Sequence, residues 1–323
     1  MRSNTQKKLS ACRLTKQVSK SIYAMAIVIL LITLVPSLSF GQGYVEGVTI
    51  SYEHMPMKIE TPAGNQKFTG NNLKIGTTVP VFLTPNKSKY LIVGGNLEAF
   101  NFSGTHPDFD VKRVYSISPT FGYSTMLSKS VNITALLTPT INSDYKDVKS
   151  SDIKFGAIVR GSWKASDNIS WRAVLGYRRQ FYGPQYVVLV GMDWKVNEKW
   201  QIFGDVPHSL TASCAVNEKV NAGFNLFVQN ATYGLNNQDR YFEYNTVNPG
   251  LFIERYISSK WAVRATAAYT LIRNMEIYNK TDKAKGFIDF YELGDRKDPI
   301  NPEVSSGFAL KIGLSYRIFP GKK

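Results

Sequence analysis

The feature that most constrains this chain is an alternation of apolar and polar residues that recurs in segment after segment. The clearest example runs from Phe308 to Ile318, where every second residue is apolar and the residues between are small, polar or basic. Successive side chains of a β-strand point to opposite faces of a sheet, so this period of two predicts a strand with one apolar face. The segments 261–271, 169–177 and 153–159 repeat the pattern. The sequence therefore predicts an all-β protein.

Short and long connectors alternate between these segments. Short polar turns fall at residues 84–89, 128–130, 166–168, 197–199, 217–219 and 258–260. Longer polar stretches occur near 53–66, 103–111, 143–152, 234–244 and 278–304, with two tight links near 181–185 and 207–210. Short turns at one end and long loops at the other are typical of a transmembrane up-and-down antiparallel β-barrel. The segments between the connectors predict 14 strands, with 12 as the alternative because 200–206 and 211–217 are the weakest.

The first 41 residues have the composition of an export signal, and the predicted barrel occupies residues 42–323. Basic residues without any acid precede an apolar run from Ala24 to Val35, and the small residues Ser39 and Gly41 stand where a signal peptidase cleaves. The run is shorter than the roughly 20 residues that a membrane-spanning helix needs. We therefore expect a cleaved signal peptide, with an uncleaved anchor as the alternative. Its removal leaves Cys214 as the only cysteine, which excludes an internal disulfide.

A soluble β-sandwich also alternates, and the polar faces distinguish the two folds. Sheet faces in water normally carry many charges of both signs. Here the polar faces are rich in Gly, Ser, Thr and Ala with scattered arginines, which fits the interior of a barrel whose apolar residues face lipid. All five tryptophans lie within three residues of a predicted short turn, and amphipathic rings prefer the headgroup level of a membrane. They predict an interfacial girdle of Trp163, Trp171, Trp194, Trp200 and Trp261.

The chain resembles the uncharacterised outer-membrane β-barrel proteins of Bacteroidota, a family defined by a domain of unknown function. The resemblance rests on the signal that ends Ser39-Phe40-Gly41, on repeated Asn-Glu-Lys and Ser-Lys turns followed by aromatic strands, and on the last strand, which ends Ile318-Phe319. It covers residues 42–319 and implies a location in the outer membrane of a Gram-negative bacterium. The implied partners are outer-membrane lipid, lipopolysaccharide and the barrel-assembly machinery. The family supplies no catalytic residues.

The net charge of +15 is the second clue to function. The signal carries only basic charges, so the mature part stays basic, and in an exported chain this points to lipid phosphates or an anion-accepting lumen rather than to nucleic acid. Seven basic residues on polar strand faces are expected to line that lumen: Lys154, Arg160, Arg172, Arg178, Arg264, Lys311 and Arg317. The alternative is that they pair with interior acids such as Asp193 and Glu254 and fill the barrel.

Three classes of function follow. The first is a channel or transporter for small solutes or hydrophobic molecules, and the second is a structural or adhesive barrel that acts through its external loops. The third is a surface lipid esterase, for which the neighbours His208 and Ser209 make a poor dyad because adjacent strand residues point to opposite faces. The acids of 278–304 are mixed with basic residues, which favours a solvated loop over a calcium site. We expect no enzyme, no cofactor and no metal.

Overall fold

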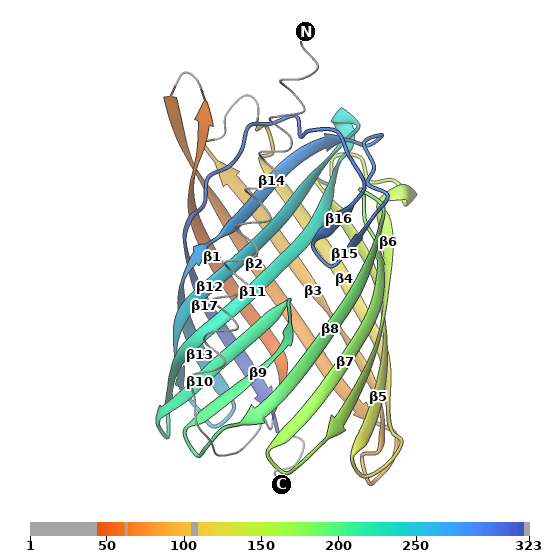
Figure 1. The fold of residues 1–323 in the computed structure, drawn as a ribbon, viewed down its shortest axis with the longest axis vertical. Coiled ribbons are helices and arrows are strands. Elements are labelled where there is room, and N and C mark those ends of the chain that lie inside the picture. Colours follow the sequence, from red (N-terminus) through yellow and green to blue (C-terminus); the bar gives the residue numbers. More distant parts are fainter. Residues whose placement is uncertain (1–43, 62–63, 105–108, 320–323) are drawn as a thin grey trace. The chain divides into compact units, whose positions relative to one another are not determined.

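The computed structural model describes residues 44–61, 64–104 and 109–319, and within these ranges the chain forms a closed antiparallel β-barrel of 14 strands (Figure 1). The predicted signal peptide lies outside the described residues. Strand β17 pairs with β1 and closes the wall, and β13 and β14 pair in succession with β12 and together form one wall strand. The predicted count of 14 is confirmed and the alternative of 12 is wrong.

The wall strands differ widely in length. In chain order they are β1 (Val45–Thr61), β2 (Gly64–Phe82), β3 (Lys89–Ser103), β4 (Arg113–Met126), β5 (Val131–Ser143), β6 (Ile153–Lys164), β7 (Ile169–Arg179), β8 (Pro184–Lys195), β9 (Trp200–Val206), β10 (Ser209–Asn217), β11 (Val220–Leu235), β12 (Arg240–Tyr256), β13 (Trp261–Thr270), β14 (Ile272–Asn279) and β17 (Gly307–Ile318). The last long loop adds a hairpin of β15 (Gly286–Ile288) and β16 (Tyr291–Leu293), and two 3-10 turns are η1 (Ser150–Asp152) and η2 (Asn236–Gln238). No helix in the described part of the chain has the length and apolar character that crossing a membrane requires.

Two predicted loops are strands instead. The connector expected near 53–66 is mostly β1 and β2, which pair without interruption from Val48 to Thr61. The connector expected near 234–244 shrinks to η2, because β11 and β12 pair up to Leu235 and Arg240. The inward side chains of these segments pack in an apolar interior. The strands therefore continue through these segments although their outward side chains are polar.

Pro119 and Pro139 lie in the same interruption of a ladder. Strands β4 and β5 pair at Ile117–Ile141 and again at Phe121–Leu137, in one register, and the residues between are left unpaired. A proline cannot donate to a ladder, and here two of them share one gap. The register is the same on both sides of the gap, and both prolines lie within their strands.

The outer face of the barrel carries an apolar belt. Side chains that point away from the interior are strongly exposed, among them Leu175 (62%), Leu251 (69%) and Phe308 (68%). Such a face is unfavourable in water and fits the hydrocarbon of a bilayer, because a closed barrel satisfies its backbone groups internally. The alternation of the sequence therefore places its apolar residues outside.

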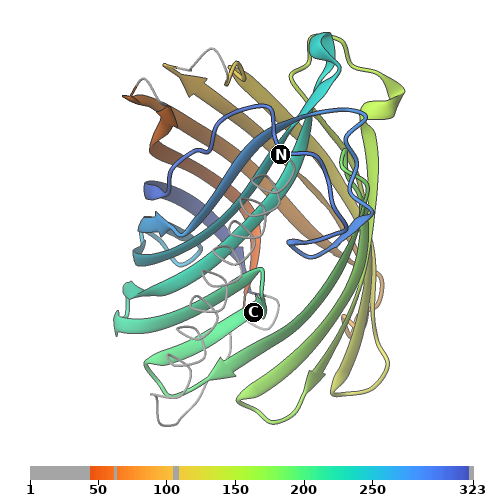
Figure 2. The same ribbon diagram turned by 45° about the horizontal axis from the view of Figure 1, so that its top comes forward.

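The wall is uneven on the side of β9 and β10. These two strands are short, and their tight turn at Pro207 and His208 leaves the loop-end halves of β8 and β11 without β9 or β10 as a ladder neighbour. β11 turns instead toward β5, where Gly234 pairs with Ser143 and accepts a hydrogen bond from the Asp144 amide at 2.9 Å. Figure 2 shows β11 and β12 reaching the loop that joins β5 to β6. At its loop end the barrel is therefore closed by β1–β5 and β11–β14.

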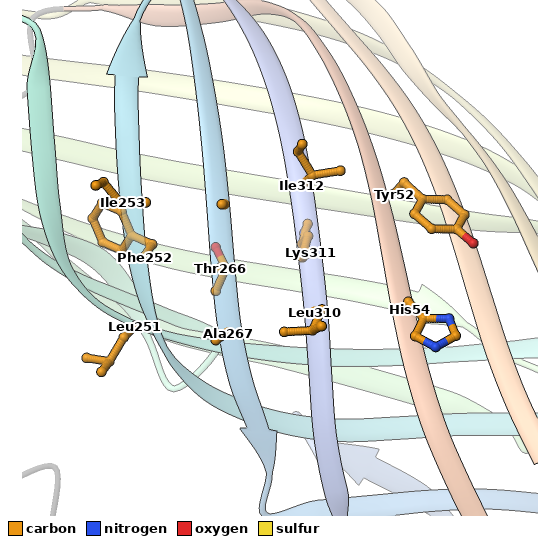
Figure 3. A pocket seen from close by; sticks show the side chains of 11 residues that line it. Tyr52, His54, Leu251, Phe252, Ile253, Thr266, Ala267, Leu310, Lys311 and Ile312 are labelled. Atoms are coloured by element: carbon orange, nitrogen blue, oxygen red, sulfur yellow. The ribbon is translucent and has the colours of Figure 1, made fainter.

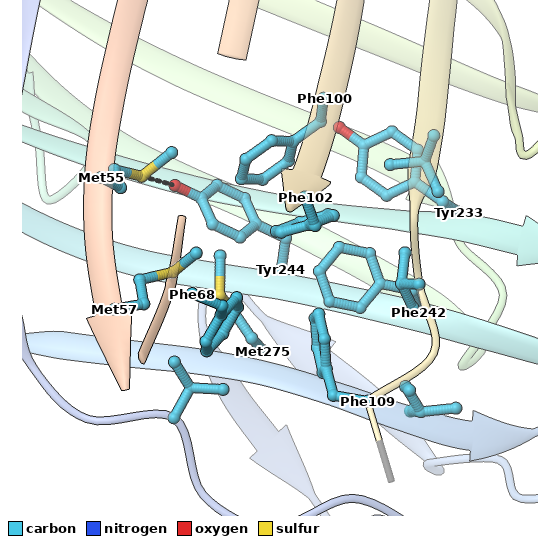
Figure 4. Packing of buried hydrophobic residues seen from close by; sticks show 14 of the residues in the cluster. Met55, Met57, Phe68, Phe100, Phe102, Phe109, Tyr233, Phe242, Tyr244 and Met275 are labelled. Carbon is cyan, nitrogen blue, oxygen red and sulfur yellow. Dashed lines mark hydrogen bonds between the residues drawn. The ribbon is translucent and has the colours of Figure 1, made fainter. Parts of the chain in front are cut away.

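An apolar cluster fills this narrowed end, and we call it the mouth cluster (Figure 4). Its side chains point inward, opposite to the exposed Tyr52 and Leu97. Tyr244 contacts Phe100 edge to face, with ring centroids 5.0 Å apart, and so joins β12 to β3 across the interior. The largest members are Met55, Met57, Phe68, Phe100, Phe102, Phe109, Tyr233, Phe242, Tyr244 and Met275.

Candidate functional site

A basic strip runs along the inner face of β6 and β7. Lys154, Arg160, Arg172 and Arg178 alternate with exposed residues such as Phe155, Val159 and Leu175, so they point into the barrel. The β6–β7 register places Arg178 opposite Gly156 and Arg172 opposite Ser162, which orders the four along the strands. The order from the turn end is Arg172, Arg160, Arg178 and Lys154.

Only one member of the basic strip has a carboxylate partner among the described residues. Arg172 Nε donates to Asp205 Oδ1 at 2.8 Å, and its Nη2 donates to two backbone carbonyls. Arg160 and Arg178 each leave a buried Nε without an acceptor. Lys154 Nζ donates to the Ser151 carbonyl at 2.5 Å and lies 4.1 Å from the centre of the Phe181 ring. The strip therefore keeps a surplus of positive charge.

The remaining predicted lumen residues are largely neutralised. Arg317, which is fully buried, donates twice to Glu254, at 2.9 and 2.6 Å, and Arg264 Nε donates to the same carboxylate at 2.9 Å. Lys311 lies inside as well, with Nζ 5.0 Å from the centre of the Phe227 ring. Of the acids named from the sequence, Glu254 has these partners, while Asp193 Oδ1 accepts from Gln201 Nε2 at 3.4 Å.

The five tryptophans lie where their strands meet the short turns. Cross-strand pairing joins Trp163 to Trp171, and Trp261 to Tyr316. Trp194 pairs with Ile169 and Ile202, and Trp200 with Cys214. Their positions in the alternation place all of them on the outer face. Their role as a membrane girdle stays a prediction.

His208 and Ser209, the neighbours considered as a dyad, have different partners. His208 Nε2 faces Asp289 Oδ1 at 3.4 Å, whereas Ser209 Oγ accepts a hydrogen bond from the Asp205 amide at 3.2 Å. His106, another histidine, lies outside the described residues. Among the described residues, no three His, Cys, Asp or Glu side chains lie close enough together to bind a metal ion.

A groove of about 660 Å³ lies on the outer face of the barrel (Figure 3). Ala265 and Ala267 of β13 form its floor, and the bulkier Leu251 and Leu310 of the neighbouring β12 and β17 form its sides. The small side chains of β13 create the groove. It belongs to the apolar belt.

The last long loop adds positive charge and buried ion pairs at the loop end. Lys283 Nζ donates to the Phe181 carbonyl at 2.6 Å, and burial lowers the pKa of its ammonium group, as do the neighbouring Arg179 and Lys280. Arg296 donates to Glu243 at 2.7 Å and to Glu292 at 2.9 Å, and its guanidinium lies 3.8 Å from the Tyr278 ring centre. These contacts fix the loop against the outer side of β12 and β14.

Sequence reasoning missed two acids and the mouth cluster. Asp205 neutralises Arg172, and Asp289 reaches the wall from a loop more than 80 residues away along the chain. Neither position has a sequence signal, since both depend on long-range packing. The mouth cluster did have a sequence signal, because the apolar residues Met55, Met57 and Ile59 occupy every second position.

Comparison with known proteins gives a family and several distant structural similarities. A family model described as "Domain of unknown function (DUF6268)" matches residues 83–317, well over half of the chain. No curated protein matches significantly. Among solved structures, the chain is similar to an outer membrane channel from Pseudomonas putida F1, with a TM-score of 0.45 and 10% identity over 87% of this chain and 100% of that one.

Two further structures show weaker similarity. The P. putida toluene transporter TodX gives a TM-score of 0.39 with 8% identity, over 85% of this chain and 91% of that one. The translocator domain of the autotransporter NalP from Neisseria meningitidis gives 0.34 with 9% identity, over 94% of this chain and 98% of that one.

Proposed function

The chain belongs to the DUF6268 family, and we propose that its barrel is an outer-membrane channel whose lumen accepts anionic solutes. The apolar belt and the closed ladder support the membrane location, because a sheet with this outer face needs lipid around it. The predicted signal peptide supports export. Outer-membrane lipid, lipopolysaccharide and the assembly machinery are its proposed partners.

The observation that carries the proposal is the basic strip. Burying a charged group without a partner is costly unless water or an ion compensates it. Among the described residues, Arg160 and Arg178 have no carboxylate within ion-pair distance and each leaves a buried Nε without an acceptor, so a lumen that holds water and anions accounts for their placement. Arg172, Arg264 and Arg317 are paired with acids and contribute less to an anionic pathway.

A second candidate, a structural barrel that acts through its loops, is favoured by the mouth cluster. This cluster closes the loop end with apolar side chains, which a permanently open axial pore would not have. A channel of this design has to open elsewhere or rearrange. The two functions therefore differ in whether the purified barrel conducts ions at all.

Ion selectivity in planar bilayers tests the channel proposal. We expect the wild-type barrel to pass chloride in preference to potassium, and Arg160→Glu together with Arg178→Glu to reverse that preference, because both remove uncompensated positive charge. Arg179→Glu is the matched control, since this neighbouring arginine lies on the outer face. A barrel that is silent in every variant supports the structural function, and a selectivity that the double variant leaves unchanged rejects the anion pathway.

A further inference from the structure

The wall has a side window between β8 and β11 above the turn of β9 and β10. β9 pairs with β8 only from Val190 onward, and β10 pairs with β11 only up to Phe227. The tip between β7 and β8 bounds the window at the loop end. There the Phe181 amide donates to Thr232 Oγ1 at 3.0 Å, and the Tyr182 hydroxyl donates to Asn230 Oδ1 at 3.0 Å. The window is thus an interruption of the ladder, bounded by β8, by β11 and by two turns.

The β15–β16 hairpin lies at this side window, beside β8 (Figure 1). β15 pairs in parallel with Gln185 and Tyr186 of β8. The Asp289 amide donates to the Tyr186 carbonyl at 2.8 Å, and Gln185 Nε2 donates to the Asp289 carbonyl at 2.6 Å. Among the described residues, no strand pairing joins the hairpin to β11. Within the described part of the chain, the hairpin therefore joins the ladder of the wall only through the three-residue strand β15, and its other contacts are side-chain ones: Phe287 packs on Tyr182 with ring centroids 4.1 Å apart, and Arg296 links Glu292 to Glu243.

The tip of the hairpin combines a carboxylate with apolar neighbours, as an amphiphilic anion does. The Asp289 carboxylate accepts a hydrogen bond from the Val188 amide at 3.3 Å, lies 3.4 Å from His208 Nε2, and interacts electrostatically with Arg178. Its neighbours Ile288 and Phe290 are exposed on the outer side. Asp289 also adopts a left-handed backbone with φ of 52°, which is uncommon for a residue other than glycine. A carboxylate on an apolar segment is thus held against the basic strip.

We propose that the β15–β16 hairpin is a displaceable panel over the side window, and that an amphiphilic anion, a carboxylate or phosphate group on an apolar chain, takes the place of its tip. The inference rests on the proposed channel function. The side window is then the exit from the channel, and amphiphilic anions are the solutes that it passes. The basic strip leads from Arg172 through Arg160 to Arg178 directly behind the panel. The apolar residues Tyr186 and Val188 outside it continue into the belt. The solute's charged group follows the strip while its apolar chain leaves toward lipid.

A disulfide that locks the panel tests its movement. Tyr186 and Ile288 are register partners, both exposed, and neighbouring strands lie about 4.8 Å apart, within disulfide reach. The double variant Tyr186→Cys, Ile288→Cys is made in a Cys214→Ser background. It is folded under reducing conditions and then oxidised. We expect oxidation to abolish chloride conductance and a reductant to restore it. The matched control is Leu175→Cys with Val188→Cys, which joins two strands that are already paired.

The outcomes separate the two proposals. If the oxidised lock conducts as well as its reduced form, the panel is not the gate and the channel proposal stands. If the wild type and all reduced variants are silent, the channel proposal fails and the panel fails with it. If the control pair also loses conductance on oxidation, the loss reflects wall rigidity and the panel inference is overturned.

Three probes, which match one another either in charge or in chain length, test which class of solute the channel accepts. We expect dodecanoate, added below its micelle concentration, to block chloride current, and acetate and dodecyltrimethylammonium at the same concentration to leave it unchanged. Arg178→Gln should relieve the block, and Arg179→Gln should not. Equal block by acetate overturns the need for an apolar chain, and equal block by the cationic amphiphile overturns the need for a negative charge.

Discussion

Replacing Glu254 by alanine is expected to destabilise the barrel by about 3–5 kcal/mol, the usual effect of removing one partner of a buried ion pair. Glu254 is 2% exposed and accepts hydrogen bonds from Arg317 and Arg264, and Arg317 is fully buried. Without this carboxylate, the buried Arg317 guanidinium keeps only the half-exposed Glu46 at 3.7 Å and the Tyr256 hydroxyl, so it loses its closest ionic partner. The measurement is urea unfolding of the barrel in lipid vesicles, followed by tryptophan fluorescence.

The matched control for Glu254 is Asp167→Ala. Asp167 forms an ion pair with Lys164 at 2.5 Å in a short turn, where both side chains are largely exposed. Exposed pairs contribute little to stability because water screens them. An unfolding midpoint that shifts as much in Asp167→Ala as in Glu254→Ala would contradict the assignment of Glu254 as the buried anchor of β12, β13 and β17.

Phe242→Ala is expected to destabilise the barrel by about 3–5 kcal/mol as well, because it leaves a cavity at the centre of the mouth cluster. Phe242 is fully buried, and its ring centroid lies 5.6 Å from that of Phe102 and 5.8 Å from that of Phe109. The same unfolding assay measures the change. Phe308→Ala, which truncates an exposed ring of the outer belt, should cost much less. Equal losses would mean that the loop end is not packed as a core.

The strand count was predictable from the sequence because alternation and turn spacing are local properties. The short turns fix one end of the barrel, and each segment between them shows its own period of two. The outer loops were less predictable. The sequence predicts a polar connector at Met55 and Met57 because His54, Pro56 and Lys58 flank them, although the same alternation continues to Ile59.

The candidate site was predictable only in part, for a physical reason. Alternation places Arg160, Arg178 and Arg317 on one face, but it does not say which acids meet them across the barrel. Glu254 was foreseen as a partner, whereas Asp205 and Asp289 were not, since each reaches its position through tertiary contacts. The side window depends on the shortness of β9 and β10, which were also the weakest predicted strands. The narrowing at Gly234 and Ser143 has no sequence signal.

Cysteine accessibility along β13 tests most directly whether the sheet closes with its apolar face toward lipid. Single cysteines are placed in a Cys214→Ser background, in vesicles, at positions 263 to 267. We expect labels at the outward positions Val263, Ala265 and Ala267 to be quenched by nitroxides on lipid chains. Cysteines at Arg264 and Thr266 should be shielded from those nitroxides and should react with small water-soluble thiol reagents. Quenching without a period of two, or a mature protein that stays monomeric in water without detergent, would contradict the barrel described here.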